Sequence, residues 1–430
     1  MWTNGINNNT NTNKYMKLKT LYILAILFFV TTSNYGQDTS LSPYAFFGIG
    51  DPAFKGNVEN VGMGGVNVYG DSIHYNINHI ASLSELKFVN FNLGMSNNFV
   101  QMTDPTQEKW ASTHNVSYFS LGIPIGKKFG FGFGLLPVSS AGYKIYNKTD
   151  DGNYTYDAKG GLNRFFFAGA YSINKDIHIG LAYNYHFGFL THNNYWIPNN
   201  TITYTRDENS VAMKGSTFKF SADYKYHISK KNYLKFNLDY RLESNLKSDF
   251  VGSTRLVTSV SGYETTVEIL NKDDKTADIT LPSELDLGIG IGKKNTWFLG
   301  AEYDYIGMKN FNNPFYDPSY VQYKDAFHLK FGGMFIPEYN SITNYWKRVT
   351  YRAGLNYKQT GMNIYGADIN DFGITFGLGL PLPRKVSNLN IGLELGQRGK
   401  ATTNLVKEKY VNLHISLSLN DRWFIKRKIN

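Results

Sequence analysis

The chain has 430 residues, a formal net charge of +10 and only 18% charged residues. It contains no cysteine, which excludes disulfides, thiolate catalysis and cysteine-ligated metals. The basic residues are scattered through strand-like segments and turns, so the net charge does not indicate nucleic-acid binding. Aromatic residues reach 16%, which is typical of membrane barrels with an aromatic girdle at each interface.

Residues 1–37 have the pattern of an export signal. Lys17 and Lys19 form a positive n-region, and the apolar run at 21–30 is about ten residues long, too short to span a bilayer as a helix. We expect cleavage near residues 36–37 and export of the mature protein. An uncleaved N-terminal membrane anchor is the alternative.

Residues 38–85 lack a regular alternation of apolar and polar residues. Glycine and proline, which punctuate turns, recur through them at Pro43, Gly48, Gly50 and residues 62–65. We expect a compact irregular segment here and not part of a sheet.

From residue 86 onward, period-two alternation predicts about fourteen amphipathic strands. In the last one, every second residue from Val411 to Leu419 is apolar and the residues between are polar. A strand of about this length crosses a bilayer when tilted. The expected strands are residues 86–96, 112–122, 128–137, 162–172, 176–188, 214–227, 232–244, 284–292, 296–306, 325–335, 347–358, 371–380, 387–396 and 409–420.

The connections between these strands alternate between long ones, such as residues 138–161 and 245–283, and short ones, such as residues 173–175. Outer-membrane barrels have long loops outside and short turns in the periplasm. The pattern predicts an all-β, antiparallel, up-and-down membrane barrel over residues 86–430. About eight strands already fill an interior with side chains, so this lumen is either a pore or plugged, and residues 38–85 are long enough to plug it.

The third expected strand combines three glycines with a proline. Gly130, Gly132 and Gly134 fall on its inward face, where the absence of side chains allows another backbone to approach closely. Pro137 lacks an N–H group, so pairing breaks or bulges there. The alternative interpretation is that the glycines relieve barrel curvature and Pro137 begins a loop.

Charged residues of both signs fall on the expected inward faces. One interpretation is a selectivity-lining path for ions. The interleaved signs favour the other, a salt-bridge network that braces the wall and anchors the plug. These residues are Lys219, Asp223, Lys235, Asp239, Arg241, Asp286, Glu302, Asp304 and Glu394.

The sequence indicates no catalytic, cofactor-binding or metal site. The histidines lack metal-ligand spacing with a second histidine or a carboxylate. Ser416 and His414 share one face of the last strand, but alternation alone often creates such pairs. We therefore expect no enzyme activity and no cofactor.

Several short motifs resemble those of the FadL/TodX-type outer-membrane transporters for hydrophobic compounds, in the form common in Bacteroidetes. One resembles that family's Asn-Pro-Ala-Ser box, with His79-Ile80 where proline is usual, and another resembles its interrupted third strand. The segments are residues 42–44, 48–51, 62–65, 75–83, 136–143 and 421–428.

The resemblance implies a hatch that blocks the lumen and a kink in the third strand, where hydrophobic molecules such as fatty acids or aromatic hydrocarbons leave sideways into the bilayer. The implied hatch residues are Pro43, Gly62, Gly64, Gly65, Asn76, Asn78 and His79. The implied kink residues are Gly130, Gly132, Gly134, Pro137, Ser139 and Gly142. It also implies a monomeric barrel in the bacterial outer membrane, in contact with its lipid and with a hydrophobic small-molecule ligand.

A second resemblance leaves the function open. The same architecture is similar to the barrel subunit that accompanies the Bacteroidetes type IX secretion machinery, which would imply protein cargo or a secretion-system protein partner. A structural barrel that transports nothing is a further alternative.

Overall fold

The computed structural model describes residues 40–260, 263–315, 319–383 and 387–423. The expected signal, residues 1–37, lies outside these ranges, so its cleavage stays a prediction. Across the described ranges, no helix has both the length and the apolar character needed to cross a membrane.

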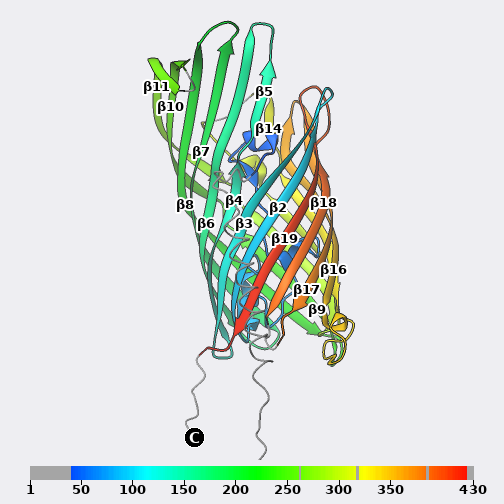
Figure 1. The fold of residues 1–430 in the computed structure, drawn as a ribbon. Helices are drawn as coiled ribbons and strands as arrows, with labels where there is room; N and C mark the ends of the chain where they lie inside the picture. Colours follow the sequence, from blue (N-terminus) through cyan, green and yellow to red (C-terminus); the bar gives the residue numbers. More distant parts are fainter. Residues whose placement is uncertain (1–39, 261–262, 316–318, 384–386, 424–430) are drawn as a thin grey trace, which may run out of the picture. The chain divides into compact units, whose positions relative to one another are not determined.

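One antiparallel sheet closes on itself into a 14-strand barrel (Figure 1), which confirms the expected fold class and strand number. The last strand pairs with the first from Asp421↔Val89 to Lys407↔Thr103 and closes the ring. Twelve wall strands are continuous: β2 (Val89–Thr103), β3 (Glu108–Ile125), β4 (Phe129–Ala141), β6 (Gly152–Ser172), β7 (Ile177–Pro198), β8 (Thr203–His227), β13 (Trp297–Ile306), β15 (Ala326–Phe335), β16 (Thr350–Ile364), β17 (Ala367–Pro381), β18 (Asn388–Arg398) and β19 (Lys407–Asp421).

The other two wall strands are each interrupted once. β9 (Asn232–Arg241) and β10 (Ser244–Val260) both pair with β8, and β11 (Tyr263–Leu281) with β12 (Glu284–Lys293) forms the next strand. The expectation of a long loop at residues 245–283 is therefore wrong. Its Thr- and Val-rich sequence favours strand, and it extends the wall as a hairpin.

Shorter elements complete the fold. They are η1 (Pro43–Phe46), β1 (Asp51–Pro52), α2 (Val58–Val61), η2 (Ile80–Glu85), β5 (Lys144–Lys148), η3 (Met308–Asn310), β14 (Val321–Tyr323) and η4 (Trp346–Arg348).

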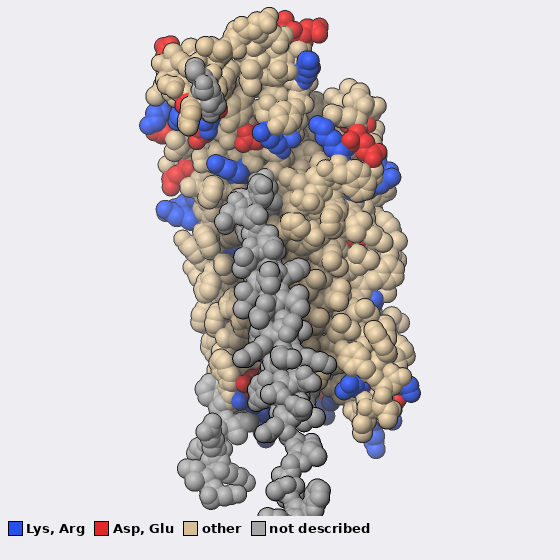
Figure 2. Space-filling view, in the orientation of Figure 1, with Lys and Arg blue, Asp and Glu red and all other residues tan. Residues whose placement is uncertain are grey.

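The outer surface of the wall is apolar. On the face drawn in Figure 2, charged side chains gather towards the two ends and the middle is nearly free of them. Outward residues such as Phe167, Phe331 and Phe376 are about half exposed, at 49%, 52% and 49%. Side chains alternate between the two faces of a strand, so this arrangement puts an apolar band against lipid and polar residues inside.

Residues 40–88, here called the inner segment, lie among the strands (Figure 1) and contact inward-facing residues on many sides of the ring. Leu83 lies against Gly130 of β4, Ile80 against Gly180 of β7, and Val58 against Gly392 of β18. Their side chains are at most 2% exposed. The core of the protein is therefore the contact between this segment and the wall.

Candidate functional site

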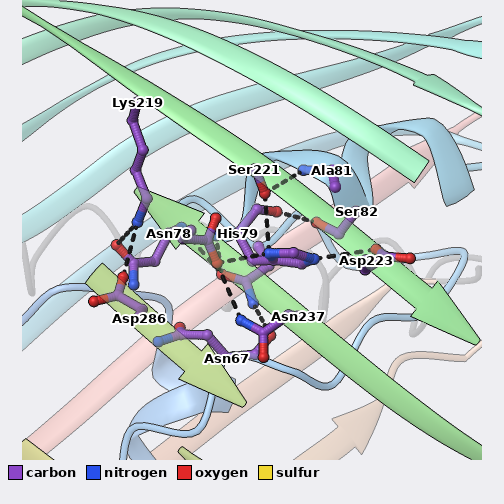
Figure 3. Close-up of polar contacts among 12 residues, drawn as sticks. Asn67, Asn78, His79, Ala81, Ser82, Lys219, Ser221, Asp223, Asn237 and Asp286 are labelled. Atoms are coloured by element: carbon purple, nitrogen blue, oxygen red, sulfur yellow. Dashed lines mark hydrogen bonds and ion pairs between the residues drawn. The ribbon is translucent and has the colours of Figure 1, made fainter. Parts of the chain in front are cut away.

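His79 is the centre of a buried polar cluster between the inner segment and the wall (Figure 3). Its Nδ1 lies 2.8 Å from Asp239 Oδ2 and its Nε2 lies 3.1 Å from Asp223 Oδ2. All three side chains are fully buried. Burial lowers the pKa of His79, but the carboxylates of Asp239 and Asp223 outweigh it and raise the pKa to about 9. A doubly protonated imidazole can donate to both carboxylates.

The same cluster holds two lysines. Lys219 Nζ donates to Asn78 Oδ1 at 3.1 Å and to Asp286 Oδ2 at 3.2 Å (Figure 3). Lys235 Nζ lies 3.0 Å from Glu85 Oε1 and 3.3 Å from Asp223 Oδ2. Wall cations thus bind groups of the inner segment directly, which ties residues 78–85 to β8 and β9.

A second ionic group lies farther around the wall. Lys330 on β15 contacts Glu302 at 2.9 Å and Asp304 at 2.5 Å. The backbone N–H of Asn67 donates to Glu302 Oε2 at 2.6 Å. Lys55 of the inner segment binds Glu284 at 2.6 Å. These contacts anchor the middle of the inner segment to β12 and β13.

A third group fastens the beginning of the inner segment. Arg398 on β18 contacts Asp51 at 2.6 Å and Glu408 on β19 at 2.6 Å. Its guanidinium also donates to Ser42 Oγ at 2.6 Å, and that hydroxyl donates to Glu408 Oε1 at 2.6 Å. Arg398 was not predicted as a site residue, because it lies two positions beyond the expected strand 387–396 and only the fold shows where its partners are.

The histidines lack metal-ligand spacing in the sequence, but the fold brings carboxylates to some of them. His79 has two such partners, and one ligand atom each of His178, Glu85 and Asp223 lies within 4.8 Å of the others. The partners are distant in sequence, so spacing could not reveal them. Lys235 contacts both carboxylates beside His178.

Three buried carboxylates, Glu284, Asp286 and Asp304, also lie together. Each contacts a cationic side chain: Lys55 and Arg241 at Glu284, Lys219 at Asp286, and Lys330 at Asp304. Buried charges need partners, and lysine and arginine supply them here without a metal.

Several glycines allow backbone-to-backbone contact between the inner segment and the wall. A Cβ on Gly332 would lie 2.1 Å from the Met63 carbonyl oxygen, and one on Gly354 would lie 2.3 Å from the Gly64 nitrogen. Gly64 itself has φ +69°, a conformation that side chains disfavour. The backbone of the inner segment therefore packs directly against these wall glycines, where any larger residue would clash with it.

The ladder between β3 and β4 stops halfway. Its last pair is Phe119↔Leu135, and along the described part of the chain no further pairing joins residues 108–118 of β3 to β4. β4 has a register shift between Pro137 and Ser139, and its end pairs with β1 of the inner segment instead. Beyond Leu135, β4 is thus no longer paired with β3, and β1 of the inner segment pairs with it at Ser139 and Ser140.

The bent end of β4 is fastened to the inner segment. Ser139 Oγ donates to the Ile49 carbonyl oxygen at 2.5 Å, and the Ala53 N–H donates to the Val138 carbonyl oxygen at 2.9 Å. Pro137 cannot donate to a ladder, which accounts for the bulge at this position.

A cavity of about 100 Å³ lies beside this contact. Ile49 lines it, so the same residue lies between the cavity and the bent end of β4. Seven of the other lining residues are apolar: Phe46, Leu190, Val211, Met213, Phe250, Ile279 and Phe315. The other four are polar: His192, Asn194, Asn209 and Asn313.

The structure brings most of the expected hatch residues into contact with the wall. Asn78 and His79 bind wall side chains, and Gly62 lies against the Gly377 Cα. Asn76 instead accepts from the backbone of its own turn, and Pro43 begins η1.

The expected kink residues divide into two groups. Gly130 and Gly132 face Leu83 and Tyr75 of the inner segment, whereas Gly134 faces Phe119 and Phe166 of the wall. Pro137 and Ser139 flank the bulge. Gly142 is buried between β4 and β5.

The expected lumen charges lie inside the barrel and are buried or nearly so. Most form the ion pairs above. Glu394 belongs to a separate group, in which it accepts from the amides of Asn356 and Asn412.

The closed barrel, the enclosed N-terminal segment and the interrupted third strand define an outer-membrane β-barrel with the FadL-type fold. The model of the BamG family matches residues 17–430, and the chain belongs to that family.

Solved structures with the same fold are similar over nearly their whole length. The toluene transporter TbuX of Ralstonia pickettii is 13% identical, with 86% of this chain and 99% of that chain covered and a TM-score of 0.57. The Pseudomonas putida toluene transporter TodX is 16% identical, over 87% and 99% of the two chains, with a TM-score of 0.57. A Pseudomonas aeruginosa FadL homologue is 13% identical, over 86% and 98%, with a TM-score of 0.55. A comparison with curated proteins gave no match.

Proposed function

We propose that this barrel takes up small hydrophobic molecules across the outer membrane and releases them sideways into the bilayer, without enzymatic chemistry. The observation that carries the proposal is the break in the β3–β4 ladder beyond Leu135. Ile49, which accepts a hydrogen bond from Ser139 at the bent end of β4, also lines a mostly apolar cavity. The solved structures that share the fold include transporters of toluene, which supports the same class of ligand.

The inner segment is the hatch in this proposal. Its backbone lies against Gly332 and Gly354 of the wall, and His79 and Lys55 are paired with wall carboxylates. In the proposal, these contacts close the lumen to polar solutes. A hydrophobic molecule leaves instead towards lipid at the place where the β3–β4 ladder is interrupted.

The cavity is the binding position for the ligand in transit. An apolar cavity of roughly 150 Å³ is enough to bind benzene, and this one, at about 100 Å³, is of the same order. Movement of Ile49 would enlarge the cavity and release the Ser139 hydroxyl at the same time. Ligand entry and opening at the kink are thus coupled through one short contact.

A disulfide across the kink tests this function. Pro52 and Ser139 are directly opposed in the β1–β4 pairing, and the chain has no native cysteine. The oxidised variant P52C/S139C holds the end of β4 against the hatch. We expect it to lose most uptake of labelled toluene and of a labelled long-chain fatty acid, and to regain it when reduced.

The matched control is L389C/L417C, which joins two opposed wall residues of β18 and β19. Its uptake should not depend on oxidation. Equal uptake by oxidised and reduced P52C/S139C would overturn release at the kink, and uptake equal to that of cells without the barrel would overturn transport itself.

A further inference from the structure

The hairpin of β10 and β11 stands on the tall side of the barrel beside β8 (Figure 1), and β10 pairs with β8 from Lys247↔Lys214 to Thr258↔Thr203. β11 pairs with β10 over its whole length, from Ser244↔Leu281 to Val260↔Tyr263. On the other side of β11, the only pairing within the described ranges is an isolated bridge between Thr280 and Asn312. The backbone of residues 264–278 therefore presents unpaired N–H and C=O groups, over a length of roughly 50 Å.

This edge has some of the features that protect strand edges and lacks others. Exposed strand edges are commonly shortened, covered, blocked by proline, or protected by charged side chains and bulges. Residues 264–278 contain no proline, and all but two of them are exposed. At the opposite side of the same projecting sheet, the edge strand β5 has only five residues.

Two β-bulges interrupt the edge within residues 264–270, and none interrupts residues 271–278. The register with β10 shifts beside Leu270 and Val267, and these two apolar side chains are 54% and 58% exposed. Residues 271–278 keep an unbroken register with β10. Residues 271–278 thus offer a regular ladder of backbone groups, and Val267 and Leu270 at the bulges offer exposed apolar surface.

The charge of the edge selects what can pair with it. β11 has five carboxylates (Glu264, Glu268, Asp273, Asp274, Asp278) and two lysines (Lys272, Lys275), a net charge of 2 − 5 = −3 in a chain of net charge +10. Lys272 and Lys275 pair with Asp274 and Asp273. Glu268 and Asp278 have no ion-pair partner among the described residues. A second copy of β11 would bring another −3 and be repelled.

We propose that the free edge of β11, residues 264–278, docks a basic, extended segment of a partner protein, which adds to the sheet as a further strand. Backbone hydrogen bonds give such strand addition its affinity, and side chains on alternate positions give its specificity. Glu268 and Asp278 are opposite Leu256 and Lys247 of β10, nine positions apart, so they lie on opposite faces of the sheet. Lysine or arginine on both faces of the added strand would meet them. The proposal does not depend on transport, because none of these residues lies at the kink or the cavity.

The test uses the full chain in lipid nanodiscs and a fluorescent peptide in which pairs of lysines alternate with pairs of valines, so that both faces of the added strand carry lysine. The peptide is about ten residues long, an ordinary strand length. We expect the peptide to bind, and the E268K/D278K variant to bind it at least tenfold more weakly. The control D150K/D151K reverses two exposed carboxylates on a different hairpin and should bind like the unaltered chain. A peptide methylated at every backbone nitrogen has the same charge but no N–H donors, and it should not bind.

Each opposite result overturns the proposal. If the lysine–valine peptide fails to bind, or binds E268K/D278K equally well, then the negative charge of the edge does not select its partner. Equal binding of the methylated peptide shows adhesion by charge alone. Disulfide-linked dimers of an Asp274→Cys variant in nanodiscs would show that a second copy occupies the edge. Uptake of toluene by E268K/D278K should remain normal, which separates this test from that of transport.

Discussion

The imidazole Nδ1 of His79 lies 2.8 Å from Oδ2 of Asp239, and the two residues are 160 positions apart in the chain. The pair joins the inner segment to β9 in a place with no access to solvent. Removal of one member of such a pair leaves a buried charge without compensation, which typically costs 3–5 kcal/mol.

His79→Ala should therefore lower the free energy of unfolding by about 3–5 kcal/mol. Urea unfolding in detergent micelles measures this. His186→Ala is the control, because His186 is buried on the wall but has one neutral hydrogen bond, to Thr217, worth about 1 kcal/mol. Equal losses in the two variants would show that the ion pairs of His79 contribute no more to the free energy of unfolding than one neutral hydrogen bond.

The stability of the hatch should depend on pH through the same residue. The folded-state pKa of His79, about 9, is above its value in an unfolded chain, so the charged form stabilises the fold. That contribution is complete below about pH 6.5, where the histidine is charged in both states. It is lost as the pH rises through about 9. Unfolding at pH 7 and pH 10 should differ more in the native chain than in His79→Ala, and an identical pH dependence would contradict this assignment.

Gly354→Val should displace the hatch. The added Cβ would lie 2.3 Å from the Gly64 nitrogen, and a backbone atom cannot move aside without shifting the segment. We expect greater ion conductance in planar bilayers and faster protease cleavage within residues 40–88. Gly169→Val is the matched control, since a Cβ there meets nothing within 4 Å. Unchanged conductance in Gly354→Val would mean that the hatch contact is not what closes the lumen.

Pro137→Val should restore an N–H at the bulge and favour continuation of the β4 ladder. In the proposed mechanism this narrows the opening beside β3, so uptake of labelled toluene should fall severalfold while heat-modified gel mobility shows an intact barrel. Pro381→Val, at the end of β17 and away from the kink, is the control. Normal uptake by Pro137→Val would show that hydrophobic molecules do not leave through the kink beside β3.

Deletion of residues 40–60 should open the lumen to small polar solutes. The deleted stretch includes Asp51 and Lys55, which hold the hatch to Arg398 and Glu284. Liposome swelling with a small sugar measures the opening. Swelling no faster than with the intact chain would show that these residues do not block the lumen.

Sequence alternation was enough to predict the wall. Residues such as Leu413 and Ile415 alternate with His414 and Ser416, and a strand between lipid and a polar interior requires that period of two. Alternation failed in β11, where residues 263–278 are almost all exposed on both faces, so no buried face imposed a pattern on them.

The bulge at Pro137 was also predictable, because a proline without an N–H cannot continue a central ladder whatever surrounds it. What covers the open side of the bulge was not predictable. Pairing of Pro52 with Ser139 joins positions 87 residues apart, and no local preference encodes it.

The sequence by itself determined the barrel, its strand number and the irregular segment before it, since these follow from local periodicity and turn chemistry. Only the tertiary structure decided how the charges pair. His79 was expected as a hatch residue, but closure of the ring is what brings Asp223 and Asp239 to its two nitrogens. Ion pairs form between side chains that are close in space, and the distance along the chain places no restriction on which ones meet.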